Sequence, residues 1–91
     1  MEIIEKKTIF EILNRIDLLA NIEQGFISYS RGHYVIPPNG ELTFDEPPGD
    51  VNIKYGYIKG EPNYVIKIAS EYRKNHELGI PNGNGMMLLF N

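Results

Sequence analysis

The sequence predicts an α+β fold in which N-terminal helices pack on a mostly antiparallel sheet. Apolar residues recur at helical spacing before residue 32, whereas residues 51–58 and 63–71 alternate between apolar and polar as strands do. The short segment KGEPN joins these two alternating runs, which is typical of an antiparallel hairpin. A chain of 91 residues is one domain at most, so residues 1–91 are expected to form a single domain.

Two helices are expected near the N-terminus. Residues 8–11 read TIFE, a capping-box pattern in which Thr8 and Glu11 satisfy backbone donors, so a short first helix is expected to begin there. Asp17 is the candidate N-cap of a second helix, and Arg31 with Gly32 supplies a cationic last turn and a C-cap. The apolar residues of this second helix are Leu18, Ile22, Phe26 and Tyr29.

The rest of the chain is expected to be strands and loops. The proline-rich residues 37–50 leave room for one short strand around 42–44, in what is either a surface connection or a functional loop. The run 51–58 predicts a strand with one polar face, and 63–71 is expected to return antiparallel to it. The final residues, MMLLFN, are apolar on both faces, which predicts a strand inside a sheet or sandwich and a chain that continues.

Composition argues against several classes of function. The net charge is −3 and the nine Lys and Arg residues are scattered, so a nucleic-acid partner is not expected. The chain has no cysteine, which excludes disulfides and thiolate chemistry, and its charged start lacks the apolar core of a signal peptide. No apolar run approaches the roughly 20 residues that span a bilayer. A cytoplasmic protein without a membrane partner is expected.

Signals for metal, nucleophile or nucleotide chemistry are weak. His33 and His76 are not at the short spacings of zinc ligands, so no metal site is expected. The serines have no recognisable His and Asp constellation. The GNG at 83–85 precedes a strand instead of following one, so it is not a dinucleotide fingerprint.

Lys67 is the residue that most needs an explanation. In the segment YVIKIASEYRKN, strand alternation sets Val65, Lys67 and Ala69 on one face. The lysine is either a solvated charge that protects an edge strand from further pairing, or a cationic group in a small-molecule site. Composition does not decide between the two.

Several segments together resemble a known family. GFISYSRGHYVIPPNGEL, GDVNIKYGYIKGE, YVIKIASEYRKN and LGIPNGNGMMLLF are similar to the N-terminal region of the ornithine cyclodeaminase and mu-crystallin family. Members are much longer and carry a Rossmann nucleotide domain after this region. The resemblance implies that residues 1–91 are a fragment, the substrate-binding and dimerisation domain, with the nucleotide-binding domain absent.

The same resemblance implies an activity. Family enzymes use NAD or NADP to cyclodeaminate, reduce or oxidise a small amino or imino acid, as in ornithine cyclodeamination, ketimine reduction and amino-acid dehydrogenation. The full-length protein is therefore expected to be an oxidoreductase or lyase of amino acid metabolism. The 91 residues alone are expected to bind no cofactor and to turn over no substrate.

The resemblance also implies site residues. The family lysine that contacts the substrate carboxylate falls on Lys67. Many members follow the proline pair with arginine, whereas Asn39 stands there in this chain, so carboxylate binding is expected to weaken or the substrate to differ. Asn82 matches a position where the family sets a small polar side chain near the cofactor. No catalytic residue is expected in this segment.

Two alternative readings stay open from the sequence. The chain could be a stand-alone small-molecule-binding or dimerisation module without catalysis. It could also be a structural domain whose exposed sheet pairs with a second copy, with Lys67 as an edge charge. A homodimer is expected because MMLLF exposes apolar surface that so small a domain cannot easily cover.

Overall fold

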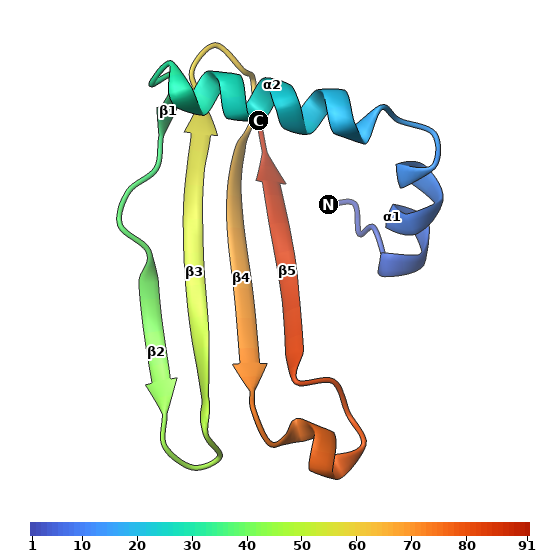
Figure 1. Cartoon of the computed structure of the whole chain (residues 1–91), viewed down its shortest axis with the longest axis vertical. Coiled ribbons are helices and arrows are strands. Elements are labelled where there is room, and N and C mark those ends of the chain that lie inside the picture. Colours follow the sequence, from blue (N-terminus) through green and yellow to red (C-terminus); the bar gives the residue numbers. More distant parts are fainter. The chain divides into compact units, whose positions relative to one another are not determined.

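The computed structural model describes all residues 1–91, which form two compact units, Met1–Gly32 and His33–Asn91. The first unit contains helices α1 (Lys6–Leu13) and α2 (Leu18–Ser30), and the second contains the strands (Figure 1). Every strand pairing is antiparallel, so the predicted α+β class is confirmed. The packing of the helices on the sheet and the assignment of a single domain stay predictions.

The two helices differ in how well their starts were predicted. The capping box is wrong, because α1 begins at Lys6 after Glu5, which makes no side-chain cap, and Thr8 lies inside the helix. The N–H of Ile9 already donates to the carbonyl of Glu5 at 3.1 Å, so the helical ladder starts before Thr8. For α2 the prediction is confirmed, since the Asp17 carboxylate accepts a hydrogen bond from the Ala20 N–H at 3.0 Å.

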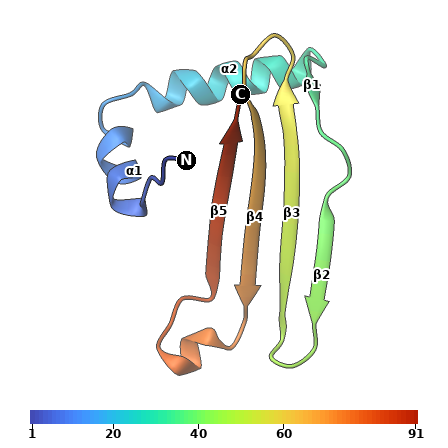
Figure 2. The ribbon, with the colours of Figure 1, turned by 180° about the vertical axis from the view of Figure 1, so that it is seen from behind.

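The second unit is one open sheet of five strands and a short 3-10 helix. The strands are β1 (Tyr34–Val35), β2 (Gly40–Phe44), β3 (Gly49–Ile58), β4 (Tyr64–Tyr72) and β5 (Gly83–Phe90), with the 3-10 helix η1 (Asn75–Leu78) before β5. Both β1 and β2 pair with one side of β3, and the order continues through β4 to β5 (Figure 2). Strands β3 and β4 are therefore internal. The expectation that the final strand lies inside a sheet is wrong within this chain, because β5 pairs with β4 alone.

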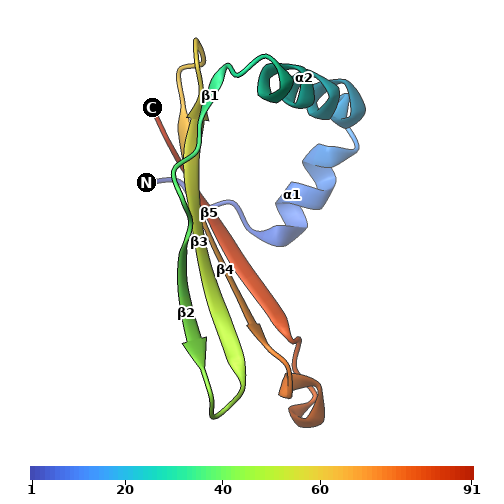
Figure 3. The same cartoon turned by 60° about the vertical axis from the view of Figure 1, so that its left-hand side comes forward.

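The register gives the sheet two different faces. Figure 3 shows the sheet nearly edge-on, with one face on each side. Residues paired directly across the strands share a face. One side, called the apolar face here, carries Val35, Leu42, Phe44, Val51, Ile53, Tyr55, Tyr57, Tyr64, Ile66, Ile68, Tyr72, Met86, Leu88 and Phe90. The other side, called the polar face, carries Glu41, Thr43, Asp50, Asn52, Lys54, Lys67, Ala69 and Glu71, together with Tyr34, Ile58, Val65, Met87 and Leu89.

No hydrophobic side chain in the chain is buried. A single sheet cannot bury its own apolar face, because a face is covered only by a second layer. Met86, for example, exposes 58% of its surface. Neither α-helix is long and apolar enough to cross a lipid bilayer.

Gly49 is the one buried residue of the chain. It pairs with Phe44 on one side and Tyr72 on the other, and those two rings meet with centroids 6.0 Å apart. A Cβ at Gly49 would lie 2.6 Å from the Tyr72 ring. Glycine therefore lets two aromatic rings from flanking strands approach each other at the end of the sheet.

Candidate functional site

Lys67 lies on an internal strand. Strand β4 is hydrogen-bonded to β3 on one side and to β5 on the other, so it has no edge to protect. The explanation of Lys67 as an edge charge is therefore wrong. Its side chain is exposed on the polar face, where strand alternation was expected to set it with Val65 and Ala69.

A second lysine stands directly opposite. The β3–β4 register pairs Lys54 with Lys67, so two ammonium groups extend from the same face of neighbouring strands. Directly paired residues have Cβ atoms roughly 4.5–5.5 Å apart, and like charges at such positions destabilise a sheet. Neither lysine takes part in an ion pair or side-chain hydrogen bond. The chain supplies no anion to this pair.

Asn39 lies in the same row as Lys54 and Lys67, where a row is a set of residues paired directly across the strands. It directly precedes β2, whose first residue, Gly40, pairs with Ile53, so continuing the register sets Asn39 beside Lys54. Its amide nitrogen donates to the Asn52 side-chain oxygen at 3.5 Å, which links it to the polar face. The structure thus brings Asn39 and Lys67, both expected to bind substrate, onto one face with Lys54 between them.

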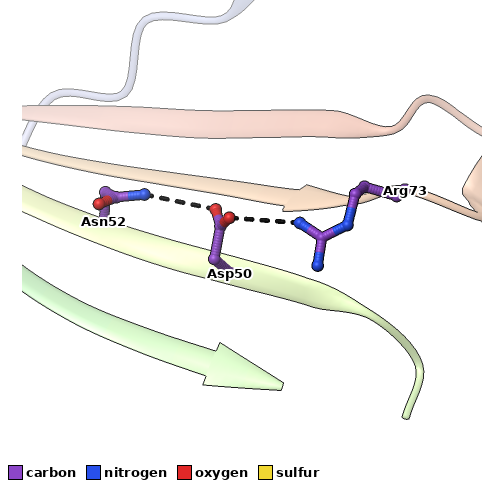
Figure 4. Close-up of polar contacts among 3 residues, drawn as sticks. All are labelled: Asp50, Asn52 and Arg73. Atoms are coloured by element: carbon purple, nitrogen blue, oxygen red, sulfur yellow. Dashed lines mark hydrogen bonds and ion pairs between the residues drawn. The ribbon is translucent and has the colours of Figure 1, made fainter. Parts of the chain in front are cut away.

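The nearby acid Asp50 is occupied by other partners. One carboxylate oxygen accepts from Arg73 at 3.4 Å, in the only ion pair of the chain, and the other accepts from Asn52 at 3.3 Å (Figure 4). Asp50 lies four residues before Lys54 along β3, two rows away on the same face. Its charge is thus compensated by Arg73, and the amide of Asn52 is tied between Asp50 and Asn39.

Asn82 lies apart from the lysines. Its side-chain oxygen accepts from the His76 N–H at 2.8 Å and its carbonyl accepts from the Tyr72 N–H at 2.8 Å, so it shapes the connection from β4 to β5. It also lines a shallow depression of about 330 Å³ with Asp50, Asn52 and Glu71. The amide N–H groups of Asn82 have no partner in the chain. Its expected role near a cofactor stays a prediction.

A larger cavity opens on the apolar face. It has a volume of about 480 Å³ and lies beside the β3–β4 turn. Its lining residues are Val35, Pro37, Tyr55, Gly56, Tyr57, Glu61, Pro62, Asn63, Tyr64 and Ile66. The sequence interpretation missed it, although Tyr55 and Tyr57 on one strand and Tyr64 at the start of the next were the available signal. Nowhere in the chain do three His, Asp or Glu side chains converge as metal ligands would.

Lys54 is the residue of the candidate site that the sequence interpretation missed. The hairpin turn pairs Tyr57 with Tyr64, and counting back three residues on each strand gives Lys54 opposite Lys67. In a hairpin, turn length fixes the register, so this pairing follows once the closing pair is known. The predicted hairpin therefore already contained the signal, but its register was not worked out.

Comparisons with known proteins give distant similarity only. No protein-family model matches the chain, and no solved structure matches it. It is 32% identical over 73 residues to a protein of Rhizobium meliloti (strain 1021) named as a dehydrogenase, RB0419, which covers 80% of this chain and 22% of that protein. It is 37% identical over 54 residues to the uncharacterised cyclodeaminase y4tK of Sinorhizobium fredii (strain NBRC 101917 / NGR234), which covers 59% of this chain and 16% of that protein.

The matched region is a small part of each relative. The alignments span 22% and 16% of the two relatives, so this chain corresponds to about a fifth of their length. Their names support a broad similarity to cyclodeaminase- and dehydrogenase-like proteins, which is the coarser form of the resemblance noted in the sequence.

Proposed function

We propose that this chain is the substrate-binding and dimerisation part of a cytoplasmic, nicotinamide-dependent enzyme of the ornithine cyclodeaminase type, acting on a small amino or imino acid. The observation that carries the proposal is Lys67, an unpaired ammonium group on the middle of an internal strand. The similarity to a cyclodeaminase-named and a dehydrogenase-named protein supports the reaction class.

Lys67 would bind the substrate carboxylate. Its ammonium group has no carboxylate partner in the chain, so an incoming acid supplies its first counter-charge. A charge-assisted hydrogen bond of this kind is roughly twice as strong as a neutral one, and removal of water strengthens it further. Asn39, two strands away in the same row, would add a neutral amide donor. Together they would hold the acid and direct its α-carbon away from the sheet.

The nucleotide cofactor needs more residues than this sequence provides. When bound, NAD or NADP would take up or deliver a hydride at the substrate α-carbon. No strand in the chain is followed by a glycine-rich turn and an α-helix, which is the arrangement that holds a dinucleotide pyrophosphate. Asn82, whose amide N–H groups have no partner in the chain, is the residue proposed to lie near this cofactor, and the chain's main contribution is to bind and orient the acid.

Kinetics of the protein expressed from its complete open reading frame would test this function. The assay follows nicotinamide absorbance with a panel of small amino and imino acids. Lys67→Gln is expected to raise KM on the order of 10- to 100-fold, since truncating one partner of a desolvated charge pair costs about 2 kcal/mol or more. Lys59→Gln, an exposed lysine after β3, is the matched control and should leave KM unchanged. A protein without nicotinamide-dependent turnover on any of these acids would disprove the proposal.

A second copy of the chain would cover the apolar face. Fourteen apolar or aromatic side chains of β1–β5 share that face and none is buried, which is more exposed apolar surface than a stable monomer usually carries. Met86 and Met87 are adjacent residues on opposite faces of the sheet, and they are 58% and 67% exposed. Met86 lies on the apolar face and Met87 on the polar face. Met86→Glu is expected to give monomers in sedimentation, and Met87→Glu is expected to leave dimers. Monomeric wild-type protein at high concentration would contradict this part of the proposal.

A further inference from the structure

We propose that Lys54 is a second substrate-binding residue and that the site selects an acid with two negative charges, such as a dicarboxylic amino or imino acid. This inference rests on the proposed function and deepens it, because it names the substrate class. It starts from one juxtaposition, the pairing of Lys54 with Lys67 across two internal strands.

The charge balance of the polar face favours a doubly charged ligand. Lys54 and Lys67 bring two positive charges to adjacent positions, and neither is matched by an acid of the chain. Glu41 is the nearest acid in register, diagonal to Lys54 across β2 and β3, and no ion pair joins them. Asp50 is held by Arg73. One carboxylate would leave one of the two ammonium groups without a counter-charge, whereas two carboxylates would neutralise both.

Small residues on one side of the two lysines leave space for such a ligand. Along β4 the next residue on this face is Ala69, and along β5 the residue beside Ala69 is Gly85. Along β3 the next residue after Lys54 on this face is Gly56. Ala69 and Gly85 thus leave room on one side of the lysines, whereas Ile36 fills the space above Gly56 and Met87 pairs directly with Lys67, so a ligand would reach both ammonium groups from the side of Ala69 and Gly85.

The position of Lys54 also compensates for Asn39. An amide at position 39 binds a carboxylate without contributing charge. Lys54 lies between Asn39 and Lys67 in the same row, so it supplies from β3 the cation that residue 39 lacks. The substrate acid would therefore meet an amide, an ammonium and a second ammonium in sequence across the sheet.

Paired ligands that differ by one charge would test this inference. The protein from the complete open reading frame is titrated with L-glutamate and L-glutamine, and with L-aspartate and L-asparagine, and dissociation constants are measured by calorimetry. In each pair the size is almost the same and only the second carboxylate is replaced by an amide. We expect at least one acid to bind about tenfold more tightly than its amide, the effect of one hydrogen bond to a charged group.

Three variants separate the inference from the proposed function. Lys54→Gln is expected to abolish the preference for the acid while binding of the amide stays unchanged, and Lys59→Gln is expected to keep the preference. If the amides bind as well as the acids, or Lys54→Gln behaves like Lys59→Gln, the inference is overturned while the proposed function stands. If no amino acid binds and Lys67→Gln changes nothing in the kinetic assay, both fail together.

Discussion

The opposed lysines predict a measurable cost in stability. We consider Lys54→Gln, Lys67→Gln and the double variant, each of which removes positive charge from the same cross-strand pair. Like charges directly opposite on antiparallel strands destabilise by roughly 0.2–1 kcal/mol. Both side chains are exposed, so water screens them and a value of about 0.5 kcal/mol is the reasonable expectation.

This value converts into a shift of melting temperature. For a domain of this size about 1 kcal/mol moves Tm by roughly 4–8 °C, so each single variant should gain about 2–4 °C. The repulsion exists only while both charges are present. The double variant should therefore gain no more than either single variant, which is the mark of a pairwise interaction in a double-mutant cycle.

Thermal unfolding followed by circular dichroism at two salt concentrations is the assay. The Debye length falls from about 10 Å at 0.1 M salt to about 3 Å at 1 M, so the gain should disappear at high salt. Single variants that lower Tm, or gains that add in the double variant and persist at high salt, would refute the reasoning. Such results would mean that the two ammonium groups do not meet across the strands.

Other variants test the local structure of the fold. Gly49→Ala should lower the free energy of unfolding in urea by about 1–3 kcal/mol, because the new Cβ would lie 2.6 Å from the Glu71 carbonyl oxygen. Gly25→Ala adds a Cβ with nothing within 4 Å, so it should stabilise α2 by about 0.5–1 kcal/mol. Asp17→Ala should cost about 1 kcal/mol through loss of the helix N-cap, and Asp17→Ser should restore most of it, as helical circular dichroism would report. Arg73→Gln should lower the free energy of unfolding by less than about 1 kcal/mol, and by less at high salt, because its ion pair with Asp50 is partly exposed.

The predictable parts of the fold were those with a strong local pattern. The hairpin of β3 and β4 follows from alternation over eight or more residues on each strand, and α2 follows from a capping aspartate with apolar residues at helical spacing. Strand β1 has only two residues, Tyr34 and Val35, too few to carry a period. It exists because β3 extends beyond β2 and offers unpaired backbone groups to Tyr34 and Val35.

The candidate site was predictable only in part, for a physical reason. Alternation predicts which face a residue occupies on its own strand, but not which residue of another strand lies opposite. Lys67 was found because it interrupts an apolar run, whereas Lys54 follows Asn52 on the polar face expected of its strand and drew no attention. Their relation is a property of the register. The turn KGEPN fixes that register, so a pairing argument from the turn outward is the step that identifies such sites.

The two faces of the sheet allow binding and assembly to be changed separately. On β4, Lys67 lies between Ile66 and Ile68, which point to the apolar face, so neighbouring positions serve different surfaces. A change at Lys67 should alter the affinity for acids and leave sedimentation unaffected, because no residue of the polar face contributes to the proposed dimer contact. A change to glutamate at Ile68 should do the reverse, since a charge on the apolar face opposes burial against a second copy. If Lys67→Gln dissociated the dimer, the lysine row itself would have to lie in the contact between copies, and the pair with Lys54 would then bind acidic residues of a partner instead of a small acid.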